Sequence, residues 1–291
     1  MWQKIERVDR RVIYILVLLL VSLPLWFPIG LPVPVAKETH DFFDVIDALP
    51  ADSVVIFSYD YGPASAPELQ PMAEAGLFHA KERGLRSVLI CFWATGAPLA
   101  VNAANLVYET DAIRYDSKYG QDVPGGIVII GFIPGGLIGM SSFASNVWAT
   151  IGVDHFGTSF ANLPLMNRVQ RAGRFGQLGT GEFGVFIDWM SGTPGAIQAI
   201  LYINGPFGTA IGTGATAVSV PEAMPYYAAG QLFGILGGLA GASEYEALVK
   251  TYGWEPTLLA PMDAQSLAHV LVIIFVVIGN IGFAASKLKG G

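Results

Sequence analysis

The amino-acid sequence predicts a Rossmann-like α/β domain, with a doubly wound and mainly parallel sheet, flanked by two transmembrane helices. Short apolar runs alternate with helical patterns through the middle of the chain, and one charge-free apolar segment lies near each end. Charged residues make up only 13% of the 291 residues, against roughly 25% in a typical soluble domain. The chain therefore combines a globular α/β pattern with the apolar excess of a membrane protein.

The first apolar segment, residues 12–31, contains no charged side chain and has about the twenty residues that cross a bilayer. Residues 1–11 precede it with four basic side chains, which predict a cytoplasmic N-terminus. A cleaved signal peptide is the alternative, but prolines stand where small residues would mark a cleavage site. We therefore expect an uncleaved anchor.

The second apolar segment, residues 267–285, is also charge-free, and two lysines follow it in the tail of residues 286–291. Basic residues again mark a cytoplasmic end, so both termini are predicted on the same side. Residues 37–255 then form an α/β domain outside the cytoplasm, periplasmic or extracellular, and residues 256–266 link it to the second helix. The expected location is the cell inner (plasma) membrane.

The domain is expected to open with an acidic helix at residues 37–49. The run SVVIFSY at residues 53–59 is apolar enough for a buried strand. Residues 67–84 predict a helix, with Glu68 in the first turn, basic residues in the last turn and a glycine after it. The run SVLICFW at residues 87–93 predicts the next buried strand.

The pattern continues with a helix at residues 97–119 and a third strand at residues 126–133. Two more short apolar strands are expected at residues 183–189 and 215–220, and a long helix at residues 226–250. Buried runs separated by helices are typical of a parallel sheet covered on both faces and joined by right-handed crossovers.

Two long runs without charge allow a different topology. Residues 123–153 and 226–243 would make the protein polytopic if they entered the membrane. The first run contains two Pro-Gly-Gly breakers, which divide it into pieces too short to span a bilayer. We therefore favour two membrane helices.

The charge balance excludes one class of partner. Ten basic and twenty-one acidic residues lie between the two apolar segments, a net charge of about −11. Such an acidic domain is not expected to bind nucleic acid or anionic lipid headgroups. The single cysteine, Cys91, excludes an intramolecular disulfide and lies in an apolar run, where we expect a buried thiol.

A ligand site is predicted from the rule that open parallel sheets bind ligands beyond the carboxyl ends of their strands. Asp60 follows the first predicted strand, with Tyr61 and Ser65 close behind it, and Asp188 lies in the fourth. His155 lies in a loop rich in groups that can contact a ligand or a neighbour. The alternative is structural: Asp60 caps the following turn, and Asp188 belongs to a polar pair.

No motif identifies a reaction. The segment GTGATA, residues 212–217, resembles a dinucleotide fingerprint by its letters, but it enters a predicted strand rather than opening a helix, so close backbone packing is the better interpretation. His155 has Asp154 before it and Ser159 after it, yet the sequence contains no GxSxG and no HExxH motif. We therefore expect no metal and no cofactor.

Two groups of residues are candidates for a contact with another chain. Arg168, Arg171 and Arg174 fall at i, i+3 and i+6, which predicts a basic stripe on one helix face that is either solvated or bound to an acidic surface of a neighbouring copy. Phe143 and Trp148 lie in the charge-free run, and contiguous apolar surface often marks a partner site.

Glycines in the predicted helix at residues 226–250 are a third group. Gly230, Gly234 and Gly238 have GxxxG spacing, and each glycine inside a helix costs about 0.5–1 kcal/mol relative to alanine. Close approach of another helix or strand, from the same chain or a second one, would compensate.

These features favour a non-catalytic structural or scaffold subunit of a membrane-anchored assembly. Its expected partners are the lipid bilayer and other copies of itself or other membrane proteins. The alternative is a membrane-tethered ligand-binding or sensory module with its site at the strand carboxyl ends. A hydrolase-type enzyme is the third hypothesis.

Overall fold

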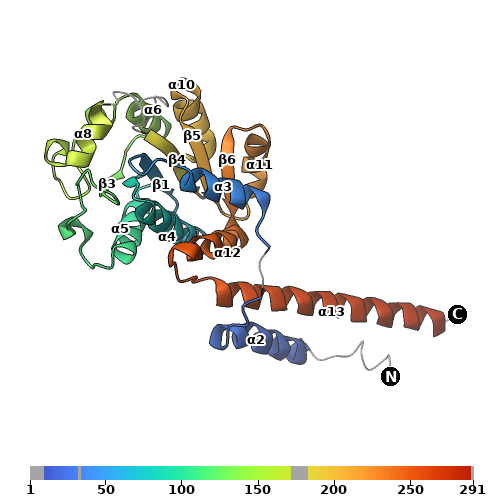
Figure 1. The fold of residues 1–291 in the computed structure, drawn as a ribbon. Helices are drawn as coiled ribbons and strands as arrows, with labels where there is room; N and C mark the ends of the chain where they lie inside the picture. The colour runs from blue at the N-terminus through green and yellow to red at the C-terminus, as the bar shows by residue number, and fades with distance from the viewer. Residues whose placement is uncertain (1–9, 32–33, 172–182, 290–291) are drawn as a thin grey trace. The chain divides into compact units, whose positions relative to one another are not determined.

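A computed structural model describes residues 10–31, 34–171 and 183–289. The chain forms two compact units: one comprises residues 34–256, and the other combines residues 1–33 with residues 257–291. The larger unit is the α/β domain, and the smaller one contains both terminal helices (Figure 1).

The α/β domain contains, in the part of the chain that is described, a six-stranded sheet with the order β3-β2-β1-β4-β5-β6. Every neighbouring pair of strands is parallel. The strands are β1 (Val54–Asp60), β2 (Arg86–Cys91), β3 (Ile127–Phe132), β4 (Phe183–Met190), β5 (Ala210–Ala215) and β6 (Leu232–Gly237). Figure 1 shows helices on both sides of this sheet, so the doubly wound α/β architecture is confirmed.

The described helices of the domain lie before, between and after the strands along the chain. They are α3 (Lys37–Asp47), α4 (Ala66–Glu82), α5 (Gly96–Val107), α6 (Leu137–Ser145), α7 (Val147–Thr150), α8 (Pro164–Arg171), α9 (Ala196–Ala199), the π-helix η3 (Ile200–Asn204), α10 (Gly205–Phe207), α11 (Val220–Ala228) and α12 (Gly238–Val249). Short 3-10 turns lie at Ile113–Tyr115, Phe160–Asn162 and Lys250–Tyr252.

The two faces of the sheet are covered by different helices. A Cβ atom at Gly76 of α4 would lie only 2.9 Å from the ring of Trp189, so α4 packs closely against this side chain of β4. The backbone N–H of Ala196 in α9 contacts the sulfur of Met190 at 3.3 Å. Since consecutive residues of β4 point to opposite faces, α4 covers one face and α9 the other.

The first four strands lie where the sequence predicts them, to within a few residues. Buried apolar runs in β1 and β2 are what a central parallel strand requires, since helices exclude water from both faces. The strand expected at residues 215–220 instead lies at residues 210–215, as β5. The helix expected at residues 97–119 ends at Val107.

The prediction of one long helix at residues 226–250 is wrong, because α11, β6 and α12 occupy this region. Gly230 has φ +72° and lies in the turn after α11. Gly234 lies in β6, where a Cβ would come within 2.5 Å of the Phe42 backbone nitrogen. Gly238 opens α12 with φ +57°. The three glycines therefore serve a turn, a close contact and a helix start, and they form no GxxxG helix face.

In the terminal unit, the described residues contain one helix that is long and apolar enough to cross a membrane, Leu259–Ala284. It belongs to α13 (Leu259–Lys289), which begins within the segment expected as a linker. The N-terminal helix α2 (Arg10–Trp26) has 17 residues, about 26 Å of helix. The expected pair of long flanking helices is therefore only partly observed, since α2 stops two residues before Pro28, and a proline disfavours helical conformation in the residue before it. The charge-free runs at residues 123–153 and 226–243 contain strands and short helices instead of a span.

Candidate functional site

The order of the strands reverses between β1 and β4. The chain proceeds from β1 to β2 on one side and from β4 to β5 on the other. In open α/β sheets, ligands bind outside the carboxyl ends of the strands at such a topological switch point. Here β1 ends with Asp60 and β4 ends with Met190.

Four polar side chains cross the sheet beside this switch point. Ser58 of β1 is in register with Asp188 of β4, which is in register with Thr213 of β5. Asp60 lies two residues after Ser58 and therefore points to the same face. All four side chains are fully buried. We refer to Ser58, Asp60, Asp188 and Thr213 as the polar row.

Asp60 accepts three hydrogen bonds. Its Oδ1 accepts from the backbone N–H groups of Phe92 and Trp93, at 2.5 and 3.1 Å, and its Oδ2 accepts from the Ser58 hydroxyl at 2.5 Å. The carboxylate therefore binds the start of the loop after β2, rather than the turn into α4. Burial raises the pKa of Asp60 to about 7, although these hydrogen bonds act in the opposite direction.

Asp188 is the least satisfied carboxyl of the polar row. It interacts directly with Asp60, and burial followed by the charge of Asp60 raises the pKa of Asp188 well above its ordinary value. Apart from a proton shared with Asp60, neither oxygen of Asp188 has a hydrogen-bond partner among the described residues. Once Asp60 ionises, above about pH 7, the pair therefore holds one proton, on Asp188, because two adjacent buried carboxylates cannot both ionise without a large electrostatic cost.

The loops after β1, β2 and β4 close over this edge of the sheet. The indole Nε1 of Trp93 donates to the backbone oxygen of Pro194 at 3.2 Å, and the Thr95 hydroxyl donates to the backbone oxygen of Tyr61 at 3.2 Å. Trp93 is half-buried, whereas the polar row beneath is closed to solvent. The loops after β2 and β4 are therefore joined at this edge, and the two carboxyls have no contact with solvent in this structure.

A short π-helix, η3, contributes to the cover of the same face. It follows α9 in the crossover from β4 to β5. π-helical turns are rare and often occur at functional sites.

A cavity of about 550 Å³ opens elsewhere, beside α6 and α7, and is lined by Ser141, Ser142 and Asn146 among others.

The structure gathers some of the predicted ligand residues and separates others. Tyr61 lies directly after Asp60, and its hydroxyl donates to Gln70 Oε1 at 2.7 Å. Ser65 precedes α4 in the same loop. His155 lies against β3, because its backbone N–H donates to Ile129 at 2.8 Å, and β2 separates β3 from β1. His155 is therefore not part of the polar row.

Asp154, which precedes this histidine, orders its own loop. Its Oδ1 accepts from the backbone N–H groups of Phe156 and Thr158 at 2.9 and 2.7 Å. Its Oδ2 accepts from the Tyr119 hydroxyl at 2.9 Å. The carboxylate is therefore committed to backbone and tyrosine donors.

Two of the predicted interface residues are engaged within the chain. Phe143 is fully buried, with its ring 6.2 Å from that of Phe92, so it offers no surface to a neighbouring chain in this conformation. Trp148 is half-buried and donates to Met166 at 3.0 Å.

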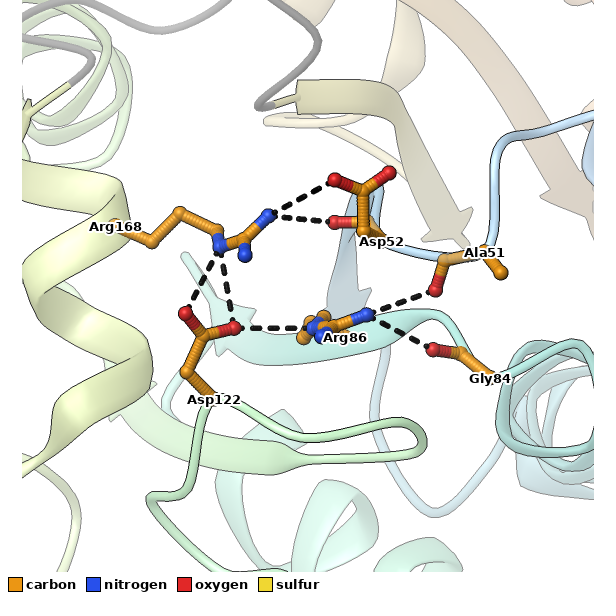
Figure 2. A network of polar contacts seen from close by, with 6 residues as sticks. All are labelled: Ala51, Asp52, Gly84, Arg86, Asp122 and Arg168. Carbon is orange, nitrogen blue, oxygen red and sulfur yellow. Dashed lines mark hydrogen bonds and ion pairs between the residues drawn. The ribbon is translucent and has the colours of Figure 1, made fainter.

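Arg168 also forms its contacts within the chain, as Figure 2 shows. Its Nε lies 3.1 Å from Asp122, and it donates to the backbone oxygen of Asp52 at 2.9 Å. The Nε of Arg86 also lies 3.1 Å from Asp122, at the same oxygen, Oδ1. The side chain of Arg171 and all of Arg174 lie outside the described residues.

Sequence reasoning missed Ser58 and Thr213. Ser58 lies in the apolar run of β1, and Thr213 lies in the GTGATA segment, whose first four residues are strand rather than nucleotide loop. Gly214 allows close packing there, since a Cβ would lie 2.5 Å from atoms of Met72 and Trp189. No group of three or more His, Cys, Asp or Glu side chains in the described ranges is placed to hold a metal ion.

Comparison with known proteins adds no relative: no protein-family model, no curated protein and no solved structure matches this chain.

Proposed function

We propose that this protein is a membrane-anchored binding module that takes a small ligand at the carboxyl edge of its sheet, between β1 and β4. The observation that carries the proposal is the Asp60–Asp188 pair, two fully buried carboxyls that interact at the topological switch point. Carboxyls with strongly raised pKa values cluster at functional sites, and this position is where open α/β sheets bind ligands.

The energetics of Asp188 support a functional role over a structural one. A buried polar group without a hydrogen-bond partner costs about 1–3 kcal/mol, and a neighbouring carboxyl adds repulsion once both ionise. A purely structural site of this size would be more stable with an apolar or amide side chain. Such unfavourable local choices persist mainly where function requires them.

The test is a ligand screen on the full chain in lipid nanodiscs. The free energy of unfolding of the domain is measured with and without each compound of a panel of amino acids, amines, sugars and carboxylic acids. The proteins compared are wild type, Asp188→Asn and, as a matched control, Asp154→Asn. A ligand of the site at a hundred times its Kd is expected to stabilise wild type by about 2.7 kcal/mol. It should stabilise the control but not Asp188→Asn. A panel in which every stabilising compound acts equally on all three proteins contradicts the proposal.

The anchor is the second part of the proposal: residues 12–31 and 267–285 cross the inner membrane, both termini are cytoplasmic, and the α/β domain lies outside. Large apolar side chains are exposed along both α2 and α13, such as Leu18 at 66% and Ile273 at 61%. Within this unit, Asp263 accepts three backbone N–H groups, those of Ile29, Gly30 and Leu31, at 2.7, 2.8 and 3.0 Å. Exposed apolar helices are stable in lipid, and the carboxylate ties the two segments together.

Cysteine labelling of spheroplasts tests this topology. The native Cys91 is fully buried, so an engineered thiol is expected to react alone. A membrane-impermeant maleimide should label Asp111→Cys, an exposed position of the domain, and should spare Lys289→Cys until the membrane is permeabilised. Labelling of Lys289→Cys from outside, or protection of Asp111→Cys, contradicts two crossings with cytoplasmic ends.

Assembly with other copies or with other membrane proteins is a separate proposal, with fewer observations in its favour than ligand binding. Phe143 is fully buried and Arg168 binds Asp52 and Asp122 within the chain. Trp148 also donates to Met166, but its side chain is only half-buried, which leaves it as the described candidate for an interface. The native mass of the nanodisc-embedded protein distinguishes a monomeric binding module from a scaffold.

A further inference from the structure

The polar row has an imbalance between donors and acceptors. The N–H groups of Phe92 and Trp93 and the hydroxyl of Ser58 all donate to Asp60. The Thr213 hydroxyl donates to the backbone oxygen of Asp188 at 2.8 Å. Every protein donor of the row is therefore committed, while the oxygens of Asp188 remain acceptors. A ligand that complements this site must bring its own donors.

The charge of the site has the same implication. Within the described residues, the ion pairs join lysine, arginine or histidine to Asp41, Asp47, Asp52 and Asp122, and none reaches Asp60 or Asp188. The pair therefore carries one negative charge when it holds its proton and two when it does not. No lysine, arginine or histidine in the described ranges forms an ion pair with either carboxyl.

The surroundings of the pair contain few other groups that could titrate. Cys91 of β2 interacts with Asp60, but burial raises the pKa of its thiol, so it stays neutral. Above the row, α9 and η3 contain Tyr202 as their one ionisable side chain in the described structure. The proton on Asp188 is therefore the one that a bound cation would replace.

We propose that the ligand of this site is a primary ammonium compound, which donates to Asp188 and displaces the proton that Asp188 shares with Asp60. In this exchange the ammonium keeps its three protons, the Asp188 O–H bond breaks, and the released proton goes to solvent. The ammonium supplies the donors that Asp188 lacks and leaves a pair of carboxylates balanced by its positive charge. This inference rests on the proposed function, since it names the ligand class of the same site.

The test uses matched probes on the full chain in nanodiscs. Ethanolamine and putrescine are titrated calorimetrically, and ethylene glycol and 1,4-butanediol serve as neutral counterparts in which hydroxyl replaces amine. The amines are expected to bind with release of about one proton, seen as a dependence of the heat on the ionisation enthalpy of the buffer. Above the pKa of Asp60, from pH 7.5 to pH 8.5, their affinity should rise roughly tenfold per pH unit, while both amines stay mostly cationic.

Asp188→Asn should abolish this binding, and Asp154→Asn should preserve it. Binding of the diols in preference to the amines, binding of the amines without proton release, or no binding of either amine at millimolar concentration overturns the ammonium assignment. If a compound of another class then proves to need Asp188, the proposed function stands without this inference. If no compound of the wider panel needs Asp188, both fail.

Discussion

Replacing Asp188 with asparagine is expected to make the α/β domain more stable at pH 8, by roughly 2–4 kcal/mol. The folded wild type must keep a proton on Asp188 at this pH, whereas the same side chain ionises freely in the unfolded chain. Asparagine has a similar shape and donates to Asp60 without any proton uptake. The variant therefore keeps the contact and removes the cost of protonation.

The gain must depend on pH in a defined direction. A carboxyl whose pKa is raised in the folded state stabilises the fold fully below its unfolded pKa, near 4. That contribution is lost as the pH rises through the folded value, which is about 7 for Asp60 and higher for Asp188. The difference between Asp188→Asn and wild type should therefore be small at pH 4.5 and should grow towards pH 8.

Denaturant unfolding of the full chain in nanodiscs, followed by tryptophan fluorescence at both pH values, measures this difference. Asp154→Asn is the matched control, and it is expected to lower the stability of the domain rather than raise it. Its carboxylate accepts two backbone N–H groups and the Tyr119 hydroxyl, so its amide variant should lose about 1–2 kcal/mol at both pH values. A loss of stability for Asp188→Asn at pH 8 would instead mean that the fold needs this carboxyl.

The strands were predictable because their signal is local. SVVIFSY and SVLICFW are apolar on both faces, and a strand between two helical layers needs no other information. The region from residue 226 to residue 250 was not predictable in this way. Its glycines repeat with a helical spacing, but Gly234 lies in a strand against Phe42 of α3, a contact that no local pattern reveals.

The candidate site was predictable in part for the same reason. Asp60 and Asp188 follow from the rule for strand ends, but their meeting depends on β4 pairing with β1, which the order of strands along the chain does not specify. Ser58 and Thr213 join them only through that register. Phe143 was predicted at a surface because its run lacks charge, yet α6 turns this ring onto Phe92.

Replacing Asp122 with alanine is expected to destabilise the domain by about 2–4 kcal/mol. The carboxylate lies between Arg86 and Arg168, at 3.1 Å from each, at the amino edge of the sheet (Figure 2). The side chain of Arg86 is only 9% exposed and that of Arg168 only 17%. Without Asp122, two guanidinium groups would face each other with little water to screen their repulsion.

Asp52 supplies the matched control for this substitution. It also pairs with Arg168, at 3.5 Å, but its side chain is 62% exposed. Asp52→Ala should therefore lose less than about 1 kcal/mol, as exposed ion pairs do. Chemical unfolding of Asp52→Ala, Asp122→Ala, Arg168→Ala and the double variant Asp122→Ala/Arg168→Ala measures the coupling between Asp122 and Arg168. The double variant should recover part of the loss, because one unpaired charge is gone.

The Asp122 variants also distinguish the roles of the two edges of the sheet, stability at the amino edge and ligand binding at the carboxyl edge. Arg86 is the first residue of β2 and Asp122 precedes β3, whereas Asp60 and Asp188 lie near the carboxyl ends of their strands. Substitution at the amino edge should lower stability without changing the affinity of any ligand that needs Asp188. Substitution at Asp188 should do the reverse, raising stability and removing the ligand. If Asp122→Ala loses no more stability than Asp52→Ala, the network of Figure 2 does not anchor α8 to the sheet.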